Sequence, residues 1–209
     1  ESAIIGGQTK YLYEVGPTDT VVGNIAYKNR GNSPWANSNV MAKVAGIVKT
    51  NVSVFPEKRG NGWCARMETR MEKVKVLGLV DIEVVAAGSV FLGSVHEPIK
   101  GTKNPQKMLQ TGIPFTKKPV ALQFDYKVKM SGRENRIRAT GFSKITDVAG
   151  KDYPAAILFL QKRWEDADGN VYAKRIGTLV TYYYHSTDWK NNATYEIMYG
   201  DITSRPEYK

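Results

Sequence analysis

The chain has 209 residues, of which 42% are hydrophobic and 24% charged, and it carries a formal net charge of +10. This length and balance are typical of one folded domain with a sizeable core, and they exclude a disordered tail. A single cysteine, Cys64, excludes an internal disulfide and zinc sites of the Cys₂His₂ or Cys₄ type, and no run approaches the ~20 apolar residues of a membrane span.

The positive charge is spread along the chain and is densest between residues 100 and 138. That segment contains no arginine-rich run, no aromatic–glycine RNA-binding signature and no helix-turn-helix pattern. We therefore expect no nucleic-acid partner. The basic residues are interpreted as a solvated surface, with a patch that steers anions as the alternative.

A period of two in the apolar residues, which is typical of half-buried strands, dominates the first half of the chain. The strands that it predicts lie near residues 21–27, 41–48, 52–55, 63–69 and 82–91. Trp63 begins one of these alternations and is predicted to lie in the core, and Cys64 is predicted to be a buried small side chain. The interval 97–111 is predicted to be a long loop, with one helical turn at 105–109.

The clearest strand spans residues 120–130, where apolar side chains at the even positions alternate with mostly polar ones at the odd positions. Pro119 opens it and a Ser-Gly pair closes it. The acidic, glycine-containing segment 166–170 predicts the turn of a β-hairpin. Further strands are predicted near residues 137–142, 155–160, 176–184 and 195–199, and the third of these is apolar on both faces, as in a central strand.

About ten short strands separated by Gly, Pro and Asn turns predict an all-β fold, namely a two-sheet antiparallel sandwich or jelly roll. Helix is expected to make up less than about a tenth of the chain, because no long stretch has helical periodicity. The sequence contains no internal repeat, no low-complexity segment and no linker. We therefore predict a single domain over residues 1–209.

No catalytic constellation emerges from the sequence. His96 and His185 have neither the spacing of a zinc protease motif nor a Gly-x-Ser-x-Gly partner, and the chain has no phosphate-binding or dinucleotide-binding glycine motif. Segment 166–170 resembles the start of a calcium loop, but Gly169 is in the fourth position instead of the sixth, and Gly177 stands where glutamate is needed. We assign no catalytic residue and expect no metal and no cofactor.

Four stretches occur in the order and approximate spacing of a known family. They are residues 31–39 (GNSPWANSN), 60–69 (GNGWCARMET), 86–93 (AAGSVFLG) and 111–127 (TGIPFTKKPVALQFDYK), and residues 182–189 (YYYHSTDW) match more loosely. The chain thereby resembles the putative carbohydrate metabolism domain family, found in exported proteins of polysaccharide-degrading gut anaerobes. The resemblance covers about residues 30 to 200.

The resemblance implies a jelly-roll sandwich like that of carbohydrate-binding modules. It also implies an extracytoplasmic location, whether secreted, periplasmic or on the outer surface, and it allows a lipid anchor upstream of the chain. The start of the chain has no signal-peptide pattern, which by itself leaves a cytoplasmic protein and a processed exported protein equally open. The family supplies no accepted catalytic residues, so none is transferred, and the expected partner is a polysaccharide or other glycan.

Sugar recognition needs a flat aromatic face for the C–H side of a pyranose and planar polar groups for its hydroxyls. Trp35 and Asn37 lie in a predicted loop rich in amides, and Trp189 lies between aspartate and asparagine residues. Loops on a rigid scaffold commonly carry binding residues. Such tryptophans equally often have a structural role, in which they fill one end of the sandwich.

Three further candidates lie on predicted strands. Trp164 ends a strand and could stack on a ligand or on its own hairpin. Gln123 and Asp125 lie on the polar face of the clearest strand, where they would line a glycan groove if that face is concave and would be ordinary solvated side chains if it is convex. The candidate carbohydrate-binding residues are therefore Trp35, Asn37, Gln123, Asp125, Trp164 and Trp189.

The favoured interpretation is a non-catalytic carbohydrate-binding domain of an exported or surface glycan-utilisation protein. A sandwich of about 200 residues that fills its interior by packing has little volume for a deep cleft with paired carboxylates. The acidic residues fall in turns or at isolated strand positions. Two alternatives stay open, a glycoside hydrolase, for which Asp125 is the first carboxylate to test, and a structural or adhesion domain of the cell surface.

Overall fold

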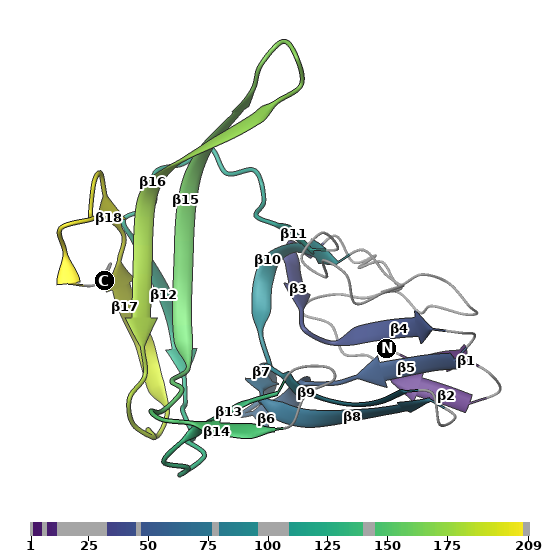
Figure 1. Ribbon diagram of the computed structural model, residues 1–209. Coiled ribbons are helices and arrows are strands. Elements are labelled where there is room, and N and C mark those ends of the chain that lie inside the picture. Colours follow the sequence, from purple (N-terminus) through teal and green to yellow (C-terminus); the bar gives the residue numbers. More distant parts are fainter. Residues whose placement is uncertain are drawn as a thin grey trace. The chain divides into compact units, whose positions relative to one another are not determined.

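The computed structural model describes residues 2–5, 8–11, 33–44, 47–76, 80–95, 109–139 and 145–206 (Figure 1). The described residues are mostly in strands and include no α-helix, and the strand pairs with a described register are all antiparallel. The predicted all-β class is therefore confirmed. Within the described part of the chain the strands form sheets of two or three strands each, and the jelly-roll connection stays a prediction.

The chain divides into two compact units. The first comprises Glu1–Phe115 and Ile137–Thr146, and the second comprises Thr116–Arg136 and Asp147–Lys209. Each unit has its own sheets, which are described separately below. The single domain predicted from the sequence stays a prediction.

The first unit consists largely of hairpins formed by consecutive strands. Its strands are β1 (Ser2–Ile5), β2 (Gln8–Tyr11), β3 (Trp35–Asn37), β4 (Val40–Val44), β5 (Ile47–Asn51), β6 (Val54–Arg59), β7 (Gly62–Met67), β8 (Arg70–Val76), β9 (Val80–Ala86), β10 (Val90–Val95) and β11 (Leu109–Thr111). The hairpins are β1–β2, β4–β5, β6–β7 and β8–β9. The other three strands form a sheet in the order β11-β10-β3.

Three predictions for this unit are wrong in detail. The single strand predicted at 41–48 is a hairpin, since Val44 pairs with Ile47 and the chain reverses between them. The strand predicted at 82–91 is interrupted between β9 and β10. The loop predicted to end at 111 stops earlier, because β11 pairs with β10. The strand predicted at 21–27 and most of the helical turn predicted at 105–109 lie outside the described residues, and Leu109 belongs to β11.

The core position predicted for Trp63 is also wrong. The Trp63 side chain is 68% exposed, and the ammonium group of Lys58, its cross-strand partner, lies 4.7 Å from the centre of its ring. Alternation in a sequence shows which side chains share a face of a strand, but it does not show which face is covered. Cys64 is half-buried, and its Sγ lies 3.5 Å from the carbonyl oxygen of Glu57.

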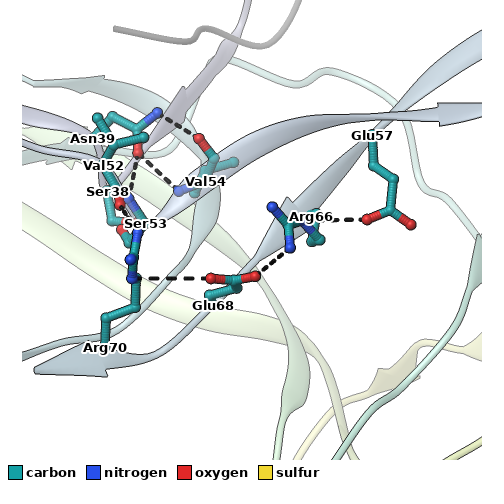
Figure 2. Close-up of polar contacts among 9 residues, drawn as sticks. All are labelled: Ser38, Asn39, Val52, Ser53, Val54, Glu57, Arg66, Glu68 and Arg70. Atoms are coloured by element: carbon teal, nitrogen blue, oxygen red, sulfur yellow. Dashed lines mark hydrogen bonds and ion pairs between the residues drawn. The ribbon is translucent and has the colours of Figure 1, made fainter. Parts of the chain in front are cut away.

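A buried polar cluster joins three segments of the first unit (Figure 2). The side chain of Asn39 accepts hydrogen bonds from the backbone amides of Ser53 (2.9 Å) and Val54 (2.8 Å), and it donates one to the carbonyl oxygen of Val54 (2.8 Å). The hydroxyls of Ser38 and Ser53 lie 2.7 Å apart, and the Ser38 hydroxyl also accepts a bond from the amide of Ser89 (2.8 Å). Side-chain hydrogen bonds thus hold together backbone segments at positions where these segments do not pair as strands.

Charged side chains continue this cluster along β7 and into β8. Arg66 pairs with Glu57 (3.2 Å) and with Glu68, and Arg70 approaches Glu68 at 4.0 Å (Figure 2). The guanidinium groups of Arg66 and Arg70 also lie 4.9 and 5.4 Å from the ring centre of Phe55. All of these groups are partly exposed, so each ion pair contributes little, and the row mainly fixes the positions of the side chains.

The second unit contains β12 (Ala121–Tyr126), β15 (Ala155–Glu165), β16 (Val171–Tyr182), β17 (Lys190–Glu196) and β18 (Met198–Tyr199). One sheet has the order β15-β16-β18, and β12 pairs with β17. The short strands β13 (Arg136–Arg138) and β14 (Thr146–Val148) pair with each other, and the division of the chain into units falls within both of them. The central strand predicted at 176–184 and the hairpin turn predicted at 166–170 are both confirmed.

The alternation predicted for the clearest strand is confirmed from Leu122 onward, but the prediction is wrong for Val120, which is 78% exposed. From Leu122 to Met130 the even positions are buried or half-buried, and the odd positions are exposed. The strand itself ends earlier than predicted, at Tyr126. The amides of Val128 and Met130 donate to the hydroxyls of Thr187 (3.2 Å) and Ser186 (3.0 Å), so side chains replace the strand ladder there.

Aromatic rings fill the space between the two sheets of this unit. Tyr183 of the β16 end lies 4.6 Å from Tyr126 of β12 and 6.4 Å from Tyr195 of β17, measured between ring centres, and Phe124 stacks on Tyr195 at 5.4 Å. Leu179, which lies on the same face of β16 as Tyr183, is only 2% exposed. A hydrogen bond to Tyr195 raises the pKa of Tyr126, and burial raises the pKa values of Tyr183 and Tyr195. Each of these hydroxyls therefore loses its proton less readily than the hydroxyl of a free tyrosine.

Candidate functional site

The six residues predicted from the sequence do not form one site. Trp35 and Asn37 belong to β3 in the first unit, and the other four belong to the second unit. Trp35 is 39% exposed, so its ring is partly open to solvent. Asn37 is only 7% exposed, and its Oδ1 accepts a hydrogen bond from the amide of Asn39 (2.8 Å). The Asn37 side chain thus holds the bend that leads into the polar cluster.

Gln123 and Asp125 lie together on the exposed face of β12, as predicted, and both bond to β17. The Gln123 amide donates to the hydroxyl of Thr194 (2.9 Å), and Asp125 accepts a bond from the amide of Asn192 (2.6 Å). Asn192 has a φ of +54°, and the register of the two strands shifts at this point. Asp125 therefore holds a β-bulge. Trp189, which is half-buried, directly precedes β17.

Trp164 stacks on its own hairpin, which is one of the two alternatives left open by the sequence. Its ring lies nearly parallel to that of Tyr172, its cross-strand partner, with 5.7 Å between ring centres and an angle of 15°. The two rings are 47% and 44% exposed. This end of the β15–β16 hairpin extends past β12, β17 and β18 (Figure 1).

The carboxylate of Asp166 fixes the turn beside this ring pair. It accepts hydrogen bonds from the amides of Asp168 (3.0 Å) and Asn170 (2.9 Å), from the side-chain amide of Asn170 (3.0 Å) and from the hydroxyl of Tyr172 (3.0 Å). These bonds, with that from the Asn170 side chain the strongest influence, hold the pKa of Asp166 below its ordinary value of 3.8. One carboxylate therefore organises both the turn and the Tyr172 ring.

Replacing Asp166 by alanine is expected to loosen this turn. Because the pKa of Asp166 is lowered in the folded chain, its stabilising effect is present above pH 3.8 and is lost as the pH falls through the lower value. We expect the Asn170 amide to exchange its hydrogen at least about tenfold faster in Asp166→Ala, measured by NMR near neutral pH. Asp168→Ala, which removes a neighbouring carboxylate from the same turn, is the control and is expected to change exchange little.

A row of apolar side chains outside the six predicted site residues lies on the other face of the same hairpin. It comprises Tyr153, Ile157, Phe159, Tyr182 and Tyr184, which we call the outer face, and these side chains are 37%, 54%, 45%, 48% and 56% exposed. In β15 they alternate with Ala156, Leu158 and Leu160, which are half-buried. The sheet is therefore covered on its inner face and largely open on its outer face, although Thr178, opposite Phe159, is only 3% exposed.

The rings of the outer face are close neighbours. Tyr153 and Tyr184 contact each other edge to face at 4.7 Å, and Tyr182 lies 6.4 Å from Tyr184. The amide of Tyr183 donates to the carbonyl oxygen of Pro154 (2.9 Å), so the two chain segments stay paired beyond the strands. The residue opposite Tyr182 is Ala155, whose small side chain leaves the Tyr182 ring uncovered on that side.

The sequence did contain a signal for this face. Residues 176–184 are apolar on both sides, and this pattern predicted a central strand. The strand is central within its sheet, but a second layer covers only one of its faces. The apolar residues at 157, 159, 182 and 184 form this open face. From the sequence alone, they could equally have been buried under a second layer.

The described part of the chain offers no metal site and no membrane-crossing helix. It contains no group of three or more His, Cys, Asp or Glu side chains that could hold a metal ion. It also contains no helix that is long and apolar enough to cross a membrane.

Comparison with known proteins identifies one family. The family model described as putative carbohydrate metabolism domain matches residues 13–152. No curated protein and no solved structure matches the chain. The matched residues include the polar cluster and β12, whereas β15 to β18 and the whole outer face follow the matched segment.

Proposed function

Because the chain belongs to the putative carbohydrate metabolism domain family, we propose that it binds carbohydrate without cleaving it, and that the glycan lies on the outer face of β15 and β16. The observation that supports this site is the set of open aromatic rings at 153, 159, 182 and 184 on one face of a sheet. Pyranose rings present flat C–H surfaces that stack on such rings, and Tyr hydroxyls can bond to sugar hydroxyls at the same time.

The inner layer of the unit supports the same proposal by making the site rigid. The outer face shares its two strands with the core, where Leu179 is buried and the Tyr183 ring contacts Tyr126 of β12 and Tyr195 of β17. Rings on a packed sheet lose little conformational freedom when a ligand binds. We also propose, from the earlier resemblance, that the domain acts outside the cytoplasm as part of a glycan-utilisation protein.

Binding without cleavage is favoured over hydrolysis by what Asp125 does. Its carboxylate bonds to the Asn192 amide and holds the bulge of β17, which is a structural task. The hydrolase alternative is tested by incubating the chain with a panel of polysaccharides and measuring released reducing ends. Release that disappears in Asp125→Asn, with the circular dichroism spectrum unchanged, would replace the proposed function.

Removing two rings of the outer face is expected to weaken glycan binding. A glycan array identifies the best ligand of the full chain, and calorimetry then compares the parent with Tyr182→Ala/Tyr184→Ala. Each stacked ring contributes about 0.5–1.5 kcal/mol beyond its buried area, so the pair should weaken binding about tenfold or more. Both side chains are about half exposed, so the fold should persist.

The matched control is Trp164→Ala/Tyr172→Ala, which removes two similarly exposed rings from the opposite face of the same hairpin. We expect this variant to bind like the parent. If it loses affinity while Tyr182→Ala/Tyr184→Ala does not, the glycan site lies at the Trp164 ring pair and the proposed outer-face site is wrong.

A further inference from the structure

The outer face continues from its aromatic rings into two arginines. Along the hairpin, Leu160 pairs with Gly177 and the next residue, Gln161, pairs with Arg175, so Ile176 is an extra residue on β16. Such a bulge reverses which residues of that strand point to each face. Beyond it, Arg175 shares the outer face with Gln161, and Ala173 shares it with Arg163.

Contact between Arg175 and the aromatic row confirms this assignment of faces. The guanidinium carbon of Arg175 lies 3.8 Å from the centre of the Phe159 ring. A guanidinium held against a ring still presents its N–H groups along its edge, where they can form two parallel bonds to a carboxylate or a sulfate. Arg175 is therefore held in place by the protein while its donors stay available.

Neither arginine is neutralised by the described part of the chain. No ion pair joins Arg163 or Arg175 to a carboxylate among the described residues, whereas Arg66, Arg70 and Arg136 each pair with at least one. The nearest acid on β15 is Glu165, and its Oε1 lies over the turn, 3.7 Å from where a Cβ would stand at Gly169.

The cations on the other face reinforce the positive potential. Lys162 and Lys174 are directly opposite each other in the ladder, between the two arginine positions. Like charges at directly opposed positions destabilise a pair of strands. Four cations at three consecutive rungs therefore give this part of the hairpin a field that favours an anionic ligand.

We infer that the glycan bound on the outer face is acidic, carrying uronate carboxylates or sulfate esters that pair with Arg163 and Arg175 while neighbouring sugars stack on Phe159, Tyr182 and Tyr184. This inference rests on the proposed function. It makes the outer face one continuous site, with stacking at the end near Tyr184 and charge recognition towards the hairpin turn. Gln161, which is exposed between the two parts, can bond to sugar hydroxyls.

The test compares acidic glycans with their neutralised forms. The probes are polygalacturonate against its methyl ester, and chondroitin sulfate against desulfated, methyl-esterified chondroitin, with the full chain at about 0.15 M ionic strength, where the Debye length is about 8 Å. We expect at least one acidic glycan to bind about tenfold or more tightly than its neutral form. A single-stranded DNA oligomer serves as a polyanion without the sugars of the probe, and it should compete poorly.

Two double variants with the same loss of charge locate the effect. Arg163→Gln/Arg175→Gln removes both cations of the outer face and should weaken binding of the acidic glycan about tenfold. Lys162→Gln/Lys174→Gln removes two cations from the opposite face, at the rung between the two arginines. It should weaken binding of the acidic glycan only about twofold, because it changes only the net electrostatic field. Arg175→Lys keeps the charge but not the paired donors, and it should fall between the parent and the double arginine variant.

Several results would overturn the inference. If the two double variants lose affinity for the acidic glycan equally, the effect comes from net charge and not from the arginines of the outer face. If DNA competes for the chain as well as the acidic glycan does, the chain binds polyanions in general. If neutral glycans bind as tightly as acidic ones and Tyr182→Ala/Tyr184→Ala still weakens binding, the proposed function stands and only the acidic ligand is wrong. If no glycan of either kind binds, the proposed function fails together with the inference.

Discussion

Asn39→Ala is expected to lower the free energy of unfolding by about 3–5 kcal/mol. The substitution removes the three hydrogen bonds that join the Asn39 side chain to Ser53 and Val54. Asn39, Ser53 and Val54 are 3%, 0% and 2% exposed, so water cannot easily replace the lost partner. Each lost bond contributes about 0.5–1.5 kcal/mol, and each buried backbone group left unpaired costs about 1–3 kcal/mol.

Urea unfolding followed by circular dichroism measures this effect, with hydrogen exchange at the Ser53 and Val54 amides as a local measurement. The matched control is Asn61→Ala in the exposed turn between β6 and β7, which is expected to change stability by less than about 0.5 kcal/mol. A change of similar size in the two variants would show that the buried polar cluster does not stabilise the first unit as described.

Gly88→Ala is expected to destabilise the same cluster by about 2–4 kcal/mol. A Cβ at this position would lie 2.4 Å from the amide nitrogen of Glu68 and 2.6 Å from the carbonyl oxygen of Ser53. These two atoms form a hydrogen bond of 2.8 Å to each other, so the new methyl group would press against a backbone bond that cannot shift aside. Forcing extra atoms into a packed site typically costs 1–3 kcal/mol, and rigid backbone neighbours raise that cost.

Gly62→Ala is the control for Gly88→Ala. A Cβ at Gly62 would meet its nearest atom, the carbonyl oxygen of Arg59, at an ordinary distance of 3.8 Å. We expect this variant to be neutral or slightly more stable than the parent, because alanine reduces the freedom of the unfolded chain. Thermal unfolding that shifts equally in both variants would contradict a steric role specific to Gly88.

The motifs that carry the family resemblance meet in the buried polar cluster and in the β11-β10-β3 sheet of the first unit. Asn39 belongs to the first stretch and Glu68 to the second, and both take part in the polar contacts of Figure 2. Gly88 belongs to the third stretch and packs closely against the backbone of Glu68. The fourth stretch pairs with the third, since Gly93 pairs with Thr111. These residues are explained by the fold, so the motifs identify the family without locating a ligand site.

Period-two alternation predicted the strands well where a strand has one covered face. It succeeded for 122–130, because a core layer there selects alternate residues. The β15–β16 hairpin was predicted from its apolar runs and its acidic turn. Alternation failed where the backbone turns without a strong turn signal. The break at Gly88 depends on backbone atoms of Glu68 and Ser53, which are distant in sequence.

The candidate site was predicted less well than the fold. Tryptophans in amide-rich segments suggested Trp35 and Trp189 as binding residues, yet the open rings of the second unit are mostly tyrosines on β15 and β16 or directly beside them. Exposure depends on whether a second layer covers a face, and this is a property of the packed chain. The bulge at Ile176, which brings Arg175 beside Phe159, likewise follows from strand register and from no local pattern.

The measurement that tests the central claim most directly is NMR mapping of the full chain titrated with the best glycan from the array. The account predicts saturable shifts concentrated at Phe159, Tyr182 and Tyr184 and continuing to Arg175, with little change at Gln123 and Asp125 on the β12 face. Shifts that gather on the β12 face or in the first unit, or no saturable shift with any glycan, would contradict it.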